Sequence, residues 1–166
     1  MARDKTETAF DFTLENLKGG ELKLKGFAGK PLLIVNTASK CGFTPQYAGL
    51  EEIWKAHKKD GLVVLGVPSN DFANQEPGSE KDIAQFCEKN FGVDFPMAAK
   101  VHVSGTRAHP LFKFLSSEGG FMAAPRWNFY KYLVGRDGHL KHWFSSFTNP
   151  TSLRFKRAIE QIVAKS

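Results

Sequence analysis

The sequence contains few cysteines and no long apolar run, and each shortage excludes a class of protein. Its 166 residues include 2 cysteines, too few to staple a disulfide scaffold or to fill a four-ligand zinc site. The longest apolar runs, residues 32–35 and 62–65, are far shorter than the ~18 residues that span a bilayer. The first ten residues mix acidic with basic side chains and lack the apolar core of a secretory signal. We therefore expect a soluble, cytoplasmic protein without stable membrane insertion.

Motifs for metals, nucleotides and nucleic acids are missing as well. The sequence has no His-Glu-x-x-His, no phosphate loop, no Gly-x-Gly-x-x-Gly and no Gly-x-Ser-x-Gly. We therefore expect neither a cofactor nor a metal, and we interpret the 5 histidines as surface or capping residues. The net charge is +6, but the basic residues are scattered among acidic ones instead of gathering on one face, so no nucleic-acid partner is expected.

What the chain does contain is the element order of one α/β domain. Its length matches the ~100–200 residues of a typical domain, and no repeat or linker divides it, so residues 1–166 are predicted to form a single domain. Residues 32–36 and 62–67 are apolar runs typical of strands buried on both faces. The predicted helix starts are Thr44 with Pro45, the Ser79/Asp82 capping box, His109 with Pro110, and Asn149 with Pro150.

Short alternating segments complete the predicted sheet. Residues 10–24 are typical of an N-terminal hairpin with a Gly-Gly turn, and residues 130–144 of a second hairpin that turns at residues 135–138. Val101 and Val103 suggest one more short strand. This order predicts a thioredoxin-like α/β fold, in which helices flank a central mixed β-sheet and an extra β-hairpin is added at the N-terminus.

Cys41 is the candidate reactive residue. It follows a buried strand and precedes a helix N-terminus, whose partial positive charge and free amides favour an anion. Lys40 adds a neighbouring cation, Gly42 leaves room for a small substrate, and we expect no apolar neighbours. These features favour the thiolate, which is the reacting form of cysteine, over an inert buried thiol.

Cys87 has two interpretations from the residues alone. It lies on the apolar face of its predicted helix, as a core residue would. The alternative is a resolving thiol that attacks an oxidised Cys41. The chain has no Cys-x-x-Cys, so it lacks the vicinal dithiol of a disulfide oxidoreductase.

Three motifs make the chain similar to a known family. They are Asn-Thr-Ala-Ser-Lys-Cys-Gly-Phe-Thr at 36–44, Gly-Val-Pro-Ser-Asn-Asp-Phe-Ala-Asn-Gln-Glu-Pro-Gly at 66–78, and Arg-Trp-Asn-Phe at 126–129. In this order and spacing they resemble the glutathione peroxidase family, in the short form that has cysteine instead of selenocysteine. The resemblance extends from about residue 10 to the C-terminus.

The resemblance implies a catalytic tetrad. Cys41 matches the peroxidatic residue, Gln75 its amide partner, and Trp127 with Asn128 the Trp-Asn pair. A thiolate that attacks a peroxide moves negative charge onto the leaving oxygen, and neutral N–H donors stabilise this shift without competing for the proton. The implied function is a thiol peroxidase that reduces hydrogen peroxide and organic or lipid hydroperoxides through a Cys41 sulfenic acid. Candidates for an apolar rim around the site are Phe43, Phe121, Met122 and Phe147.

The resemblance also implies a role for Cys87. In two-cysteine relatives a resolving cysteine precedes a Gly-Val-x-Phe-Pro stretch, and Cys87 followed by residues 92–96 matches this. A Cys41–Cys87 disulfide, reduced by thioredoxin instead of glutathione, is therefore expected. We place the two cysteines on different helices, so the second helix must unfold locally to bring their Cα atoms within ~7 Å. Larger relatives use an insertion for tetramer contacts. The short segment 119–126 lacks this insertion, so we expect a monomer.

Two residues depart from the family pattern Pro-Cys-Asn-Gln-Phe. Ser69 replaces a cysteine outside the tetrad, and Asp71 places an acid where an amide is usual. If Asp71 points toward the site, its charge disfavours the Cys41 thiolate and slows peroxide attack.

Three other functions remain open. The first is a peroxide sensor or redox relay that passes oxidation to a partner protein. The second is a one-cysteine glutathione-dependent peroxidase, and the third is an inert binding module with an unreactive Cys41. A peroxiredoxin requires Pro-x-x-x-Thr-x-x-Cys, but Ile34 and Ala38 occupy the Pro and Thr positions, which argues against that family. Turnover with thioredoxin separates an enzyme from a relay.

Overall fold

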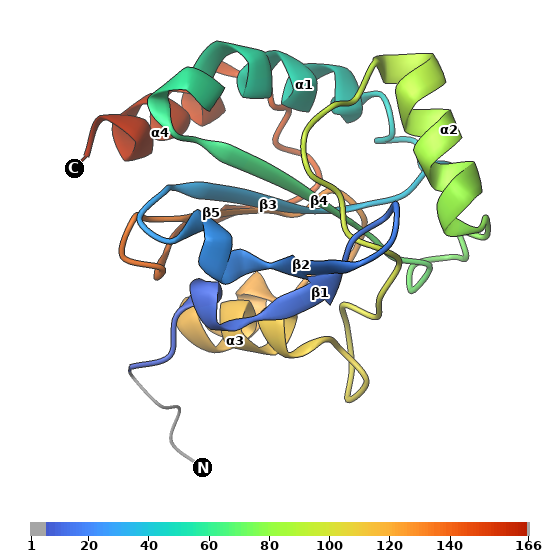
Figure 1. The fold of residues 1–166 in the computed structure, drawn as a ribbon, viewed down its shortest axis with the longest axis horizontal. Coiled ribbons are helices and arrows are strands. Elements are labelled where there is room, and N and C mark those ends of the chain that lie inside the picture. Colours follow the sequence, from blue (N-terminus) through green and yellow to red (C-terminus); the bar gives the residue numbers. More distant parts are fainter. Residues whose placement is uncertain (1–5, 166) are drawn as a thin grey trace.

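A four-stranded mixed sheet forms the centre of the computed structural model, which describes residues 6–165 (Figure 1). The strands are β3 (Leu32–Thr37), β4 (Val63–Pro68), β5 (Lys131–Val134) and β6 (Leu140–Phe144), in the spatial order β4-β3-β5-β6. β3 pairs in parallel with β4 and antiparallel with β5, which in turn pairs antiparallel with β6. Every residue of β3 and β4 is buried, because both faces of this sheet are covered.

Helices cover the two faces of the sheet with two separate apolar cores. On one face lie α1 (Gln46–His57), α2 (Glu80–Phe91) and α4 (Leu153–Ala164), and on the other lie α3 (Pro110–Gly119) and the N-terminal hairpin of β1 (Thr13–Glu15) and β2 (Glu21–Lys23) (Figure 1). Residues 6–165 also contain four short 3-10 helices, one before β1 and three between later elements: Ala9–Asp11, Leu24–Phe27, Lys58–Asp60 and Phe121–Ala123. The mixed sheet, the flanking helices and the added hairpin confirm the predicted fold class.

Two of the four predicted helix starts are correct. Ser79 accepts a hydrogen bond from Asp82 N–H while the Asp82 carboxylate accepts from Ser79 N–H, which forms the expected capping box of α2. His109 caps α3, and Pro110 occupies the first turn. Residues 6–165 include no helix that is long and apolar enough to cross a bilayer.

Two predicted helix starts are wrong because the predicted capping side chains bind elsewhere. Thr44 does not cap α1, since its hydroxyl is occupied within the preceding turn, and the helix begins at Gln46. The last helix is capped by Ser152, whose hydroxyl accepts from Phe155 N–H at 3.4 Å. Asn149 instead accepts from Thr151 N–H, in a turn that precedes the helix.

The strand predicted at Val101 and Val103 is also wrong. Val101 N–H donates to the Pro68 carbonyl, but Val103 N–H donates to the Asp71 side chain, so no ladder forms at this point. A strand requires consecutive backbone hydrogen bonds to a neighbouring strand. With one isolated bond of this kind, Val101 and Val103 lie in a loop.

Candidate active site

Cys41 lies in a turn between β3 and α1, at the end of a central strand. Its N–H donates to Thr44 Oγ1 at 2.9 Å, and the same hydroxyl donates to the Ala38 carbonyl at 2.8 Å. The Cys41 Sγ atom in turn accepts a hydrogen bond from Phe43 N–H at 3.3 Å. Thr44 therefore fixes the shape of the turn, and the turn directs a backbone N–H donor at the sulfur.

The expectation that Cys41 lacks apolar neighbours is wrong. Cys41 is only 8 % exposed and belongs to the apolar core beneath α1 and α4. Its neighbours in this core come from distant parts of the chain, which local sequence does not reveal. A surface cavity of about 350 Å³ begins at the adjacent Gly42 and is lined by Phe43 and Phe147, whose rings meet edge to face at 5.4 Å.

Gln75 and Asn128 meet beside this turn although 53 positions separate them. Asn128 Nδ2 donates to Gln75 Oε1 at 3.0 Å, and the Gln75 carbonyl accepts from Lys40 N–H at 3.0 Å. Within residues 6–165 the side-chain N–H groups of Gln75 make no hydrogen bond to the protein. The arrangement thus holds Gln75 against the Cys41 turn and leaves its amide donors available.

Trp127 is half-buried and is held by its main chain. Its carbonyl accepts from Asn36 Nδ2 at 2.9 Å, and Asn36 Oδ1 accepts from Tyr130 N–H at 3.0 Å. The Trp127 ring packs on Phe72 with centroids 6.0 Å apart. Asn36 is a buried amide at the end of an apolar strand, and it fastens the segment that carries Trp127 and Asn128 to β3.

Asn36 and Thr44 are the two positioning residues that sequence reasoning missed. The signal for Asn36 was an amide inside a run of buried apolar residues, because a buried polar side chain needs partners. For Thr44 the only signal was its spacing from Cys41, which equally fits a helix cap. Both residues act on the backbone, so their type alone indicates no role in the site.

Three non-glycine residues near the candidate site adopt left-handed backbone conformations. Ala73 has a φ of 55° and Asn74 a φ of 53°, just before Gln75, and Phe129 has a φ of 63°, just after Asn128. Such conformations are unfavourable for most L-residues and persist where surrounding contacts impose them. Both side chains of the Gln75–Asn128 pair are therefore presented by strained backbone.

Cys87 lies on α2 and is a free thiol, as is Cys41. Burial raises the pKa of Cys87 to about 11, although an interaction with the Tyr47 hydroxyl opposes this change. Of the 12 residues of α2, only Ile83 and Cys87 are buried. The expectation that the two cysteines lie on different helices is wrong, because Cys41 lies in the turn that precedes α1.

The chain entering α2 is anchored by Lys100. Its ammonium donates to the carbonyls of Gly78 at 2.7 Å and Glu76 at 3.2 Å, and its N–H donates to the Glu80 carboxylate at 3.0 Å. Glu76 in turn accepts from Ser39 N–H at 3.0 Å, and burial raises the pKa of this carboxyl group. The contacts link the start of α2 to the strand ends that carry the Cys41 turn.

A comparison with models of protein families shows to which family the chain belongs. The family model described as glutathione peroxidase matches residues 9–116. The chain belongs to the glutathione peroxidase family. The match spans Cys41, Gln75 and Cys87, while Trp127 and Asn128 follow it in the sequence.

Known family members resemble the chain along most of its length. It is 45 % identical over 146 residues to the glutathione peroxidase-like peroxiredoxin gpx1 of Schizosaccharomyces pombe, covering 87 % of this chain and 92 % of the relative. It is 44 % identical over 161 residues to the hydroperoxy fatty acid reductase gpx1 of Synechocystis, covering 92 % of this chain and 95 % of the relative. A crystal structure of Trgpx in apo form superposes with a TM-score of 0.77 at 36 % identity, covering 96 % of this chain and 97 % of that one. The protein is therefore a thiol peroxidase, an enzyme that reduces hydroperoxides, with the thioredoxin-like fold.

Asp71, the departure from the family pattern, binds the loop 102–104. Its carboxylate accepts from His102 Nδ1 at 2.6 Å and from the N–H groups of Val103 and Ser104 at 2.8 and 3.1 Å. Burial would raise the pKa of Asp71, but these hydrogen bonds outweigh it and the pKa is lowered. Asp71 therefore anchors the loop 102–104, and its charge is engaged in these hydrogen bonds.

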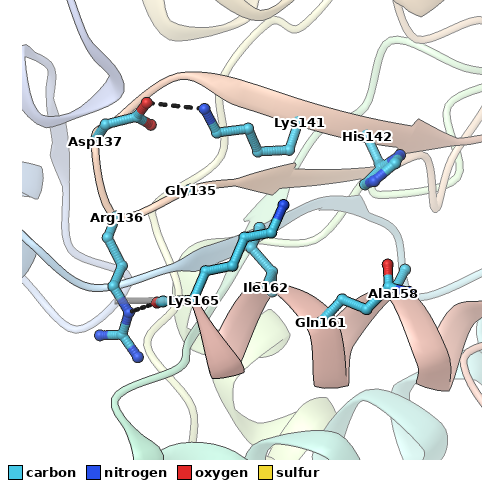
Figure 2. A pocket seen from close by; sticks show the side chains of 9 residues that line it. All are labelled: Gly135, Arg136, Asp137, Lys141, His142, Ala158, Gln161, Ile162 and Lys165. Carbon is cyan, nitrogen blue, oxygen red and sulfur yellow. Dashed lines mark hydrogen bonds and ion pairs between the residues drawn. The ribbon is translucent and has the colours of Figure 1, made fainter.

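Another cavity, of about 290 Å³, lies between the β5–β6 hairpin and α4 (Figure 2). Arg136 reaches from the hairpin to the end of α4, where it donates to the carbonyls of Lys165 and Val163 at 2.6 and 2.9 Å. Asp137 pairs with Lys141 at 2.8 Å. No candidate active-site residue lines this cavity, and its most polar side chains bind the protein itself.

Proposed function

We propose that the protein reduces hydrogen peroxide and organic hydroperoxides, including lipid hydroperoxides, with Cys41 as the attacking thiolate. Gln75, Trp127 and Asn128 are the proposed polar partners of this reaction. The observation that carries the proposal is the linkage of Asn128 through Gln75 to Lys40 N–H, which gathers amide groups at the Cys41 turn. We further propose that residues 1–166 act as one domain and as a monomer.

The first step oxidises Cys41 by two electrons. The thiolate attacks one peroxide oxygen, an S–O bond forms, and the O–O bond breaks. The leaving oxygen takes up a proton and departs as water or an alcohol, and Cys41 becomes a sulfenic acid. The amide and indole N–H donors stabilise negative charge as it moves onto the leaving oxygen.

In the second step Cys87 attacks the Cys41 sulfenic acid, which gives a disulfide and releases water. The buried, protonated Cys87 thiol does not react from within an intact α2, so this helix must open first. Only Ile83 and Cys87 of this helix are buried, which supports such local opening. Thioredoxin then reduces the disulfide by thiol–disulfide exchange; glutathione is the alternative reductant.

Apolar surface near the site supports organic hydroperoxides as substrates. Phe147 is 85 % exposed and lines the cavity next to Cys41, and Phe121 is 79 % exposed in the segment before Trp127. The name of the Synechocystis relative, a hydroperoxy fatty acid reductase, supports the same substrate class. We propose that these aromatic side chains contact the hydrocarbon part of the substrate.

One experiment tests the proposed cycle. The reduced protein is mixed with one equivalent of hydrogen peroxide, its thiols are mapped by mass spectrometry, and thioredoxin, its reductase and NADPH are then added. We expect a Cys41–Cys87 disulfide and sustained NADPH oxidation. A lasting Cys41 sulfenic acid that only glutathione clears would make this a one-cysteine enzyme.

Two further outcomes separate the remaining functions. A disulfide that forms with peroxide but passes only to a partner protein, without turnover with thioredoxin, would indicate a relay. Cys41→Ser is the matched control and must abolish peroxide consumption. An unoxidised Cys41 in the parent protein would overturn the proposal.

A further inference from the structure

Lys131, the first residue of β5, carries a buried amino group that the proposed cycle does not use. Its side chain is fully buried, and strand alternation places it on the face covered by α1 and α4, with Leu133. Burial lowers the pKa of Lys131 to about 7. No carboxylate among residues 6–165 forms an ion pair with it.

The amino group is held by two backbone carbonyls. Lys131 Nζ donates to the Ser145 carbonyl at 3.2 Å and to the Ser146 carbonyl at 3.3 Å. These two acceptors match the two N–H bonds of the neutral amine. A methionine would fill a similar volume without the cost of burying a polar group, so the specific contribution of lysine at this position is the pair of hydrogen bonds.

Ser146 connects Lys131 to the candidate active site. Ser146 is 2 % exposed, and its hydroxyl donates to the Asn128 carbonyl. Its own carbonyl also accepts from Gln46 Nε2, at the start of α1, at 2.8 Å. Because Asn128 Nδ2 donates to Gln75 Oε1, an unbroken series of hydrogen bonds leads from Lys131 through Ser146 and Asn128 to Gln75.

The same contacts place an aromatic side chain at the site. Phe147 follows Ser146 directly, and its ring meets Phe43, two residues after Cys41. The turn that Lys131 holds therefore touches the proposed site on two sides, at the Asn128 backbone and at the apolar cavity beside Cys41.

We propose that Lys131 is a positioning residue for peroxide reduction, which holds the Ser145–Ser146 turn so that the Ser146 hydroxyl keeps Asn128 in place beside Gln75. The inference rests on the proposed role of Asn128 at Cys41. Lys131 touches no reacting atom and acts through Ser146 and Asn128. Small displacements of polarising groups at a reacting centre cost large factors in rate.

The test compares the two halves of the catalytic cycle in Lys131→Met and Ser146→Ala. We expect the rate constant for Cys41 oxidation by hydrogen peroxide to fall about 10-fold in each variant, and the rate constant for reduction by thioredoxin to stay unchanged. A smaller folded fraction would lower both rate constants equally. Leu133→Ala, on the same face of β5, is the control: it should lower the melting temperature and leave the ratio of the two rate constants unchanged.

The Asn128→Ala background decides whether Lys131 acts through Asn128. If it does, Lys131→Met has no further effect on the oxidation rate of Asn128→Ala. An unchanged oxidation rate in Lys131→Met and Ser146→Ala, with Asn128→Ala impaired, would overturn the positioning role alone. An unimpaired Asn128→Ala would overturn the proposed site instead. If Lys131→Met does not fold, Ser146→Ala decides the question by itself.

Discussion

The two cysteines lie in regions of the molecule that are held in opposite ways. The Cys41 turn is tied to its surroundings by Thr44 and by the Lys40–Gln75 hydrogen bond, and it adjoins strands buried on both faces. Cys87 lies on a helix that buries two side chains. In the proposed cycle, Cys41 therefore meets the substrate in a preorganised site, whereas Cys87 lies on a helix that opens for the second step.

The difference suits a cycle whose two steps have opposite requirements. Attack on a peroxide needs fixed donors around the sulfur, because preorganised donors need no rearrangement as charge moves. Resolution needs movement, because a disulfide requires Cα atoms within ~7 Å of each other. The capping box at Ser79 and the left-handed Gly92 at the other end define α2 as a unit that can open as a whole.

The largest expected effect comes from Cys87→Ser. We expect the first oxidation of Cys41 to keep its rate and thioredoxin-supported turnover to fall at least about 100-fold, since the sulfenic acid is no longer converted into a disulfide that thioredoxin reduces. Stopped-flow oxidation and NADPH consumption measure the two quantities. With excess peroxide, mass spectrometry should show sulfinic acid at Cys41. Undiminished turnover would assign Cys87 to the core alone.

A matched pair of cavity variants tests whether α2 is the looser region. Replacing a buried isoleucine by alanine costs ~2–5 kcal/mol, so Ile83→Ala should increase the open population of α2 at least about 10-fold. Ile53→Ala on α1 should lower global stability without selectively opening α2. Hydrogen exchange of the α2 amides and the rate of disulfide formation after a peroxide pulse report the difference. Equal α2 exchange in the two variants would contradict the comparison.

Two buried groups, Lys131 on β5 and Cys87 on α2, should change the stability of the protein with pH in opposite directions. Lys131 has a lowered pKa of about 7, so the folded protein releases this proton while the unfolded chain keeps it, and stability rises above pH 7. Cys87 has a raised pKa of about 11, so its contribution to the free energy of unfolding is complete below pH 9 and is lost as the pH rises toward 11. From pH 7 to 9 the parent should gain about 2 kcal/mol relative to Lys131→Met. Urea titrations across this range measure the free energy of unfolding of both proteins. If it changed equally with pH in the parent and in Lys131→Met, the lowered pKa of Lys131 would be contradicted.

The smallest expected effect concerns Asp71→Asn. Because the Asp71 carboxylate binds His102 and the loop 102–104, restoring the amide usual in the family should not accelerate Cys41 oxidation. Stability should fall by about 1 kcal/mol through the weaker hydrogen bonds. Peroxide rate constants and chemical denaturation test both statements. A marked acceleration would mean that the charge does act on the thiolate.

Much of the fold follows from local patterns in the sequence. The apolar runs at 32–35 and 62–65 coincide with β3 and, except for residue 62, with β4; the capping box at Ser79 precedes α2, and the turn at 135–138 lies between β5 and β6. Each of these patterns depends on neighbours a few residues apart. The strand prediction failed where a side chain found a distant partner. Val103 N–H binds Asp71, so the short strand that its valines suggested does not form.

The sequence by itself indicated the chemical groups of the candidate site, because its motifs around Cys41, Gln75 and Trp127 resemble those of the glutathione peroxidase family. Only the tertiary structure decided how these groups are held. It buried Cys41, paired Asp71 with His102, and joined Lys131 to Asn128 through Ser146. The physical reason is that burial and hydrogen bonding depend on atoms that the chain brings together from many positions apart, and local sequence carries no record of those encounters.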